Sequence, residues 1–243
     1  YSQARLLFRS LTPPEQRHVI SAFAFELGKV ETKAIRRRML GHLKHVDAKL
    51  WEGVESALGM EGQAEFITPA IEPRDLPPSP ALSILGKAPV TLKGRKIGIL
   101  VTDGFNADLL NALKAAAKKE GASVALIAPK VGGAKDAQGT LTEVDMALSA
   151  GPSFFFDTVV ILASDEGVEG LKKEAAAVDW VRDAFGHLKV IAHANAEPLL
   201  KLAAVKADEG VVSLGAKTDV ADYISRAKKG RIWEREPMLR SPG

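Results

Sequence analysis

Three polar side chains stand where strands of a predicted sheet end, and they could carry chemistry. Asp103 follows the apolar run Ile97–Val101, while His193 and Asn195 stand at the end of the run Lys189–His193. A parallel sheet binds its ligands beyond the carboxyl ends of its strands, so an acid, a base or a nucleophile would be well placed there. Each of these side chains could instead have a purely structural role. We choose between a functional and a structural role by asking whether the groups that the chemistry requires are present.

Asn195 occupies the turn at which folds of this type often present a nucleophile on a tight strand-to-helix elbow. An elbow nucleophile must be Ser or Cys, with a base nearby to remove its proton, and an amide cannot take that role. His193 could act as a base, but no nucleophile stands beside it. We therefore favour a packed, hydrogen-bonded histidine, and we predict no catalytic residue in this chain.

The loop after the first strand, residues 102–108, contains only Gly104 as a glycine and lacks both phosphate-cradling patterns. The favoured interpretation is that Asn106 or Asp108 caps the following helix. The alternative is that Asp103 is a polar group in a crevice of the sheet.

The histidines predict no metal site. His42 and His45 are three positions apart on a predicted helix, but no carboxylate and third histidine accompany them, and His18 and His187 lie far away in sequence. The chain has no cysteine, which excludes a disulfide, a cysteine-ligated metal and a cysteine nucleophile. We expect no cofactor or metal on this segment, and a reducing, cytoplasmic location is compatible with the composition.

Charge and composition argue against nucleic acid and membrane partners. The 33 Lys+Arg against 30 Asp+Glu leave a net charge of +3, and two tyrosines offer little for base stacking. Arg36, Arg37 and Arg38 form a basic run that we interpret as a solvated helix face or a carboxylate-pairing site. No apolar run reaches the length of a membrane span, and no cationic start followed by an apolar stretch indicates a signal peptide. Phe154–Phe156 is most simply core, although exposure of part of it would mark an interface.

Apolar strands alternate with helices in the C-terminal part of the chain. This predicts a parallel sheet covered on both faces, in a flavodoxin-like, doubly wound α/β fold. The expected strands are Ile97–Val101, Val124–Ala128, Thr158–Ala163, Lys189–His193 and Val211–Leu214, with helices at about 106–120, 166–186 and 196–206.

Prolines divide the chain. Six of the 13 prolines fall between Pro69 and Pro89, so residues 66–92 are predicted to form an extended linker. We expect it to lie along a surface because its apolar side chains need cover. These are Ile71, Leu76, Leu82, Ile84 and Leu85. The predicted organisation is a helical segment at 1–65, this linker at 66–92 and the α/β domain at 93–243.

The helical segment has two predicted helices. Thr12 is a good N-cap, with Glu15 three residues later as in a capping box, and this helix ends near Gly28. The second helix carries an apolar stripe from Ile35 to Ala57, spaced by three and four, and Gly59 closes it. Two amphipathic helices form a thin core, so they need a partner surface.

Several stretches resemble the C-terminal helical region of haem catalases. They are Tyr1–Leu6, Leu11–Ile20 and Phe25–Val30. The following helix, the proline-rich strap and the flavodoxin-like domain are similar to the large-subunit branch of that family, as is the ending Arg231–Pro237. The resemblance covers essentially the whole chain. It implies a parent whose haem is held in an upstream β-barrel by residues that are absent here.

The α/β part also resembles the class I glutamine-amidotransferase-like superfamily, which includes intracellular-protease-like and chaperone members. The resemblance places the elbow cysteine of that superfamily on Asn195, and its acidic residue near Leu109, one place past Asp108. Both departures imply that the hydrolase chemistry is lost while the architecture remains.

Three hypotheses follow. The first is a structural C-terminal part of a large-subunit catalase, whose partners are the upstream barrel and neighbouring subunits of a homotetramer that dismutates hydrogen peroxide. The second is a protein-binding module with holdase-like chaperone activity toward unfolded clients. The third, an independent small-molecule enzyme, lacks a nucleophile or cofactor motif. Because the chain starts with Tyr1, we expect it to be part of a longer protein.

Overall fold

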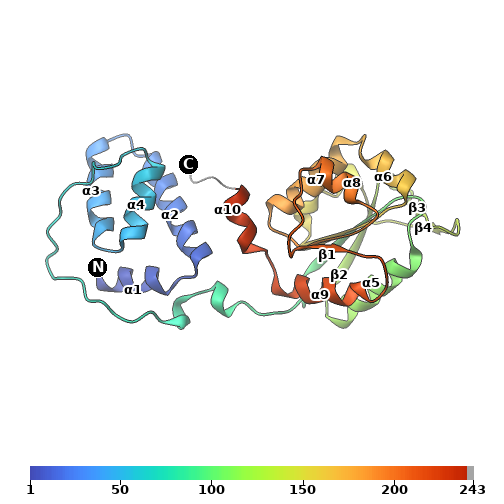
Figure 1. Cartoon of the computed structure of the whole chain (residues 1–243), viewed down its shortest axis with the longest axis horizontal. Helices are drawn as coiled ribbons and strands as arrows, with labels where there is room; N and C mark the ends of the chain where they lie inside the picture. The colour runs from blue at the N-terminus through green and yellow to red at the C-terminus, as the bar shows by residue number, and fades with distance from the viewer. Residues whose placement is uncertain (240–243) are drawn as a thin grey trace. The chain divides into compact units, whose positions relative to one another are not determined.

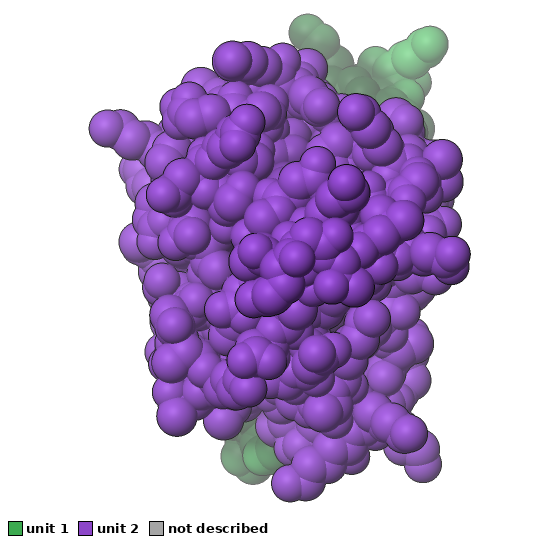
Figure 2. Space-filling model, turned by 90° about the vertical axis from the view of Figure 1, so that its right-hand side faces the viewer, with its two compact units in different colours: residues 1–88, 237–243 green, residues 89–236 purple. Residues whose placement is uncertain are grey.

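A computed structural model describes residues 1–239 of the chain, which form two units that meet in sequence at Ala88 and Pro89. Figure 2 shows them in different colours, with residues 89–236 in purple and the helical unit in green. The α/β unit contains the sheet and the candidate site. The helical unit contains residues 66–88 of the linker predicted at 66–92, and the α/β unit contains the rest.

The α/β unit is built on a six-stranded sheet in the order β5-β2-β1-β6-β7-β8, in which every neighbouring pair is parallel. Its strands are β1 (Lys96–Val101), β2 (Ser123–Ala128), β5 (Met146–Ala147), β6 (Thr158–Leu162), β7 (Ile191–Ala194) and β8 (Val211–Ser213). The chain winds outward from β1 to β2 and then crosses to β6 on the other side of β1. The predicted flavodoxin-like α/β class is confirmed, and its switch point lies between β1 and β6.

Helices cover both faces of this sheet, as Figure 1 shows. On one face, α5 (Ala107–Lys119) and α9 (Asp219–Lys229) share a core with alternate residues of β1, whereas α6 (Asp165–Leu171), α7 (Ala175–Gly186) and α8 (Glu197–Leu202) pack on the other. Burial on both faces explains why the strands read as near-continuous apolar runs. Gly98 belongs to β1, where an added Cβ would come within 2.3 Å of the Phe156 ring.

The α/β unit differs from the sequence-based prediction in several places, among them α9, a helix that was not predicted. A sixth strand, β5, is only two residues long, and a small hairpin forms from β3 (Ala134–Lys135) and β4 (Leu141–Thr142); such short pairings leave little periodicity to detect. The helix predicted at 166–186 is interrupted between α6 and α7. The fourth predicted strand begins two residues later than expected, at Ile191.

Residues 1–65 of the helical unit form four α-helices rather than two: α1 (Ser2–Ser10), α2 (Pro13–Gly28), α3 (Lys33–Lys44) and α4 (Ala48–Ala57). The single helix predicted over 35–57 was wrong, because α3 ends at Lys44 and a separate helix, α4, begins after Asp47. The Asp47 side chain accepts a hydrogen bond from the backbone N–H of Lys49 at 3.0 Å and so caps α4. The core of this unit is small. It consists of Phe8, Leu27, Leu40, Leu43, Val46, Leu50, Val54 and Met60.

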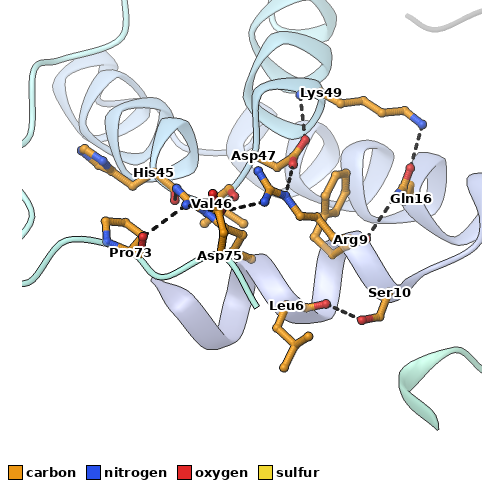
Figure 3. A network of polar contacts seen from close by, with 12 residues as sticks. Leu6, Arg9, Ser10, Gln16, His45, Val46, Asp47, Lys49, Pro73 and Asp75 are labelled. Atoms are coloured by element: carbon orange, nitrogen blue, oxygen red, sulfur yellow. Dashed lines mark hydrogen bonds and ion pairs between the residues drawn. The ribbon is translucent and has the colours of Figure 1, made fainter. Parts of the chain in front are cut away.

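Hydrogen bonds and ion pairs hold the linker against the helices, and Figure 3 shows this network around Arg9 and Asp75. Both Arg5 and Arg9 donate to Oδ1 of Asp75 at 2.8 Å. The linker therefore lies along this unit, but the expected reason was partly wrong. Ile71 and Ile84 are 83% and 78% exposed, so hydrogen bonds and ion pairs hold the segment where apolar cover was expected.

Glu15 of α2 accepts a second set of hydrogen bonds that hold the linker against the helices. Its carboxylate accepts hydrogen bonds from the hydroxyl of Ser83 at 2.8 Å and from the N–H groups of Ile84 and Leu85 at 2.7 and 2.9 Å. The N–H of Thr12 also donates to it at 2.8 Å, as the predicted capping box requires. Burial opposes ionisation, but these donors outweigh it and lower the pKa of Glu15 to about 2.

The end of the α/β unit is held by Arg235, whose side chain is fully buried. Its guanidinium forms a bidentate pair with Asp208, donates to the carbonyl of Lys189 at 2.9 Å and lies 4.0 Å from the centre of the Phe185 ring. Among the described residues, no helix is long and apolar enough to cross a membrane.

Candidate functional site at the switch point of the sheet

Asn195 lies in the turn between β7 and α8, with a φ of 59°. This left-handed conformation is uncommon for a residue other than glycine, and asparagine is one of the side chains that tolerate it. Its Nδ2 donates to the carbonyl of Ala163, at the end of the neighbouring β6, at 3.4 Å. The turn therefore has the tight geometry of an elbow, and the side chain that it presents is an amide without nucleophilic character.

His193 is buried in β7, two residues before the elbow, with a side chain that is 5% exposed. Its Nδ1 is 3.6 Å from Oε1 of Glu197, and within residues 1–239 this nitrogen makes no hydrogen bond. Burial lowers the pKa of His193, and the nearby Glu197 only partly opposes that shift. The imidazole is thus held neutral. The expectation of a packed histidine agrees with the structure, while the expected hydrogen bonding is missing at Nδ1.

The switch point between β1 and β6 is closed by hydrogen bonds between the two loops. The hydroxyl of Ser164, after β6, donates to the carbonyl of Asp103, after β1, at 2.6 Å. The Ser164 N–H donates to Oγ1 of Thr102 at 3.3 Å, and the Asp103 carboxylate accepts from the N–H of Lys135 at 2.7 Å. The crevice in which a ligand of this fold would bind is therefore bridged by the protein itself.

A glycine makes this closure possible. Gly167, in the first turn of α6, packs so closely on β1 that an added Cβ would lie 2.0 Å from Oγ1 of Thr102. Sequence reasoning missed both Ser164 and Thr102. The signal that could have found Ser164 is its position between an apolar strand and two acidic residues, because this pattern is typical of an N-cap; its hydroxyl accepts from the Gly167 N–H at 3.0 Å.

The remaining residues of the first loop have structural positions. Asn106 caps α5 as predicted, because its Oδ1 accepts from the N–H of Leu109 at 3.1 Å. Asp108 is exposed and forms an ion pair with Lys217 at 3.2 Å. Leu109 is buried in the core. The position that the superfamily resemblance assigned to an acidic residue therefore holds an apolar side chain inside the sheet's helical layer.

The other histidines and the arginine run make separate polar contacts. His42 and His45 bind different groups, the hydroxyl of Tyr1 at 2.6 Å and the carbonyl of Ile67 at 2.7 Å. No group of three or more metal-ligating side chains occurs in the described part of the chain. Arg36 donates to the carbonyls of Val30 and Gly28 at the end of α2, a contact with backbone where we expected solvent or a carboxylate.

The three phenylalanines before β6 divide between core and surface. Phe156 is buried, whereas Phe154 and Phe155 are 56% and 53% exposed. Their rings contact each other edge to face, with centroids 5.0 Å apart. The prediction of a core position was wrong for this pair, and exposed apolar side chains of this kind are what was expected of an interaction surface.

Neither tyrosine of the chain fits the axial ligand of a haem. Tyr223 is completely buried, its hydroxyl is 3.1 Å from Oγ1 of Thr158, and burial raises its pKa. The Tyr1 hydroxyl is engaged by His42. A tyrosine that ligates haem iron must present its phenolic oxygen to the metal as a tyrosinate. Neither tyrosine of residues 1–239 is therefore placed to act as such a ligand.

Comparison with known proteins gives matches over nearly the whole chain. A family model described as the C-terminal domain found in long catalases matches residues 93–237, and one described as catalase-related immune-responsive matches residues 1–58. Catalase C of Rhizobium meliloti is 46% identical over 99% of this chain and 35% of its own length. Catalase HPII of Pseudomonas putida is 32% identical over 97% of this chain and 33% of its own length.

Catalase-2 of Bacillus subtilis is 32% identical over 94% of the chain and 32% of its own length. The chain thus spans about a third of the length of the curated relatives that it matches. The sheet, its covering helices and the closed switch point all lie within the range that the first family model matches. The chain belongs to the family of C-terminal domains found in long catalases.

Proposed function

We propose that this chain is the C-terminal structural part of a large-subunit catalase that dismutates hydrogen peroxide to water and oxygen. In this proposal the chain stabilises assembly and supplies no catalytic group. The haem belongs to an upstream barrel, and the partners are that barrel and neighbouring subunits of a homotetramer. The cytoplasm is the predicted location.

The exposure of large apolar side chains on the helical unit is the observation that carries this proposal. Phe25, Phe66 and Ile71 are 65%, 88% and 83% exposed, although the core of this unit is small. Burying each such side chain on a partner would contribute roughly 1.5–3 kcal/mol. These side chains therefore suit a unit that docks on another part of a larger assembly.

The test uses the full-length parent catalase with and without the region that corresponds to this chain. Removal is expected to lower the midpoint of thermal inactivation or to break the oligomer, while peroxide turnover per haem in the oligomer that remains is unchanged. A sharper version compares the double variant Phe66→Ser/Ile71→Ser with Val131→Ser, which changes an exposed apolar residue of the α/β unit. Only the double variant should weaken the assembly.

The isolated chain provides the complementary measurement. We expect neither a stoichiometric haem absorption band nor oxygen release from peroxide, because the distal and proximal groups are absent. Hydrolase and glyoxalase assays should stay at background for both the wild type and Asn195→Ala, since no nucleophile stands in the elbow. A wild-type rate that the substitution abolishes would contradict the absence of catalytic groups.

A holdase-like function is the second candidate, and the exposed Phe154–Phe155 pair favours it. Two adjacent aromatic rings could bind apolar segments of unfolded proteins. In this case the chain would suppress aggregation of a heat-unfolded model enzyme, and Phe154→Ser/Phe155→Ser would abolish the effect. Equal suppression by this variant, or no suppression by the wild type, would contradict the second candidate while leaving the first untouched.

A further inference from the structure

A groove of about 390 Å³ separates α5 and α9 on one face of the sheet. Figure 1 shows these two helices next to each other beneath the strands. Its walls are apolar where the helices approach each other. Ala116 of α5 and Ala221 of α9 are small side chains in its lining, together with the buried Ile224 and the exposed Val90. The volume lies within the range of small-molecule sites, roughly 300–1,000 Å³.

The rim of the groove is cationic. Lys119, Lys228 and Lys229 line it, and Glu120 is the one carboxylate among its lining residues. Glu120 is already paired with Lys228, with 2.9 Å between Oε2 and Nζ. Within residues 1–239, Lys119 and Lys229 have no ion-pair partner. The groove therefore has two positive charges, those of Lys119 and Lys229, that no carboxylate of the described residues neutralises.

The dipoles of the helices do not account for this charge. The groove runs to the C-terminal ends of α5 and α9, each equivalent to about half a negative charge. Arg95 already binds one of those ends, donating to the carbonyl of Ala227 at 3.3 Å. The three rim lysines and Glu120 together carry more positive charge than the partial negative charges of the two helix ends can neutralise. An anion would therefore be favoured at this end of the groove.

We propose that this groove binds a small amphipathic anion, an aliphatic carboxylate whose head lies between Lys119 and Lys229. Its alkyl chain covers Ala116, Ala221 and Ile224. The charge complementarity selects an anionic head, and the apolar walls select a hydrocarbon tail. Neither the peroxide chemistry of a catalase nor an assembly role requires such a site, so this proposal stands apart from the proposed function.

The test is an NMR titration of the isotopically labelled chain with hexanoate, octanoate and decanoate. Octanoate should bind saturably with a Kd on the order of 1 mM, and shifts should be confined to α5, α9 and the residues around Val90. Affinity should rise about twofold to fourfold per added methylene, because each buried CH₂ contributes about 0.8 kcal/mol. Acetate and octanol, which each lack one half of the ligand, should bind much more weakly.

Three variants assign the site. Lys119→Glu/Lys229→Glu should weaken octanoate binding at least about tenfold, since it reverses both rim charges. Ser225→Trp, at an exposed position of α9, should fill the groove and abolish binding while keeping the lysines. The matched control Lys173→Glu changes an exposed lysine outside the groove and should bind like the wild type. Circular dichroism checks that each variant is folded.

The proposal fails if octanoate gives no saturable shifts, or if shifts appear outside the groove. Equal affinity for acetate and decanoate would reveal a purely electrostatic patch of lysines and would also overturn it. If the charge-reversal variant binds as tightly as Lys173→Glu, the head of the ligand does not lie at the rim.

Discussion

Asp208 and Arg235 form a bidentate ion pair in which Oδ2 of Asp208 accepts from Nε of Arg235 at 2.7 Å and Oδ1 accepts from Nη2 at 2.8 Å. The arginine is completely buried, whereas the aspartate side chain is 19% exposed. The pair joins the loop before β8 to the end of the unit. Because the same guanidinium also binds the carbonyl of Lys189, it connects the segments that precede β7 and β8.

Loss of this arginine is expected to destabilise the α/β unit strongly. Arg235→Met removes three kinds of contact and leaves the Asp208 carboxylate unpaired, so the free energy of unfolding should fall by about 3–5 kcal/mol. Urea denaturation followed by circular dichroism measures it. The control is Arg226→Gln, which breaks the exposed pair with Asp222 and should cost about 1 kcal/mol or less. Similar losses in both variants would contradict the assigned role of Arg235.

Lys189 should make stability rise with pH in the alkaline range. Its Nζ donates to the carbonyl of Ser153 at 2.6 Å, and burial, with a contribution from nearby Arg231, lowers its pKa from 10.5 to about 8. Between these two values the unfolded chain keeps a proton that the folded chain has lost, so the free energy of unfolding increases with pH by up to about 1.4 kcal/mol per unit. Urea titrations from pH 7 to 10 check this.

The variant Lys189→Met isolates this contribution of Lys189 from other groups that titrate in the same range. The wild type should gain stability relative to Lys189→Met as the pH rises through 8. Parallel pH profiles for the two proteins would show that the ammonium group is not desolvated in the folded state.

Gly167 offers a direct test of the closed switch point. Gly167→Ala places a methyl group against Thr102, so the free energy of unfolding should decrease by about 1–3 kcal/mol. Gly170 lies in the same helix, and a Cβ there meets nothing within 4 Å. Gly170→Ala should therefore be neutral or stabilise the protein by up to about 1 kcal/mol. Thermal or urea unfolding of both variants measures these changes. If Gly167→Ala is as stable as the wild type, the crevice opens easily.

Glu15 predicts an acid-sensitive linker. Its folded pKa of about 2 lies below the ordinary value of 4.5, so its contribution to stability is complete above pH 4.5 and is lost as the pH falls toward 2. Glu15→Gln should cost about 1.5–3 kcal/mol at neutral pH and remove this part of the acid sensitivity. Amide hydrogen exchange of residues 83–86 should accelerate in the variant. Unchanged exchange there would show that the carboxylate does not hold the linker.

Sequence periodicity predicted the parts of the fold that depend on local pattern and burial. The strands around Ile97 and Val159 were recognisable because they are apolar on both faces, and Asn106 was recognisable as a cap from its place before α5. The break at Asp47 was not, since the apolar stripe continues across it and hides the competing side-chain hydrogen bond.

Some features of the candidate site could be predicted from the sequence and others could not. The elbow at Asn195 could be located from the end of a strand, because backbone geometry there follows from the fold. The hydrogen bond between Ser164 and Asp103 could not, since it joins residues 61 positions apart. Exposure of Phe154 and Phe155 was also beyond prediction, because an aromatic run before a strand looks the same whether or not the rings reach the core.

The left-handed turn at Asn195 has a consequence at the level of codons. Asparagine and serine codons are separated by a single base transition, so one mutation would place a hydroxyl on an elbow whose backbone is already formed. A cysteine there requires two base changes. The elbow thus lies one mutational step from a potential nucleophile, and the buried neutral imidazole of His193 is already in the adjoining strand.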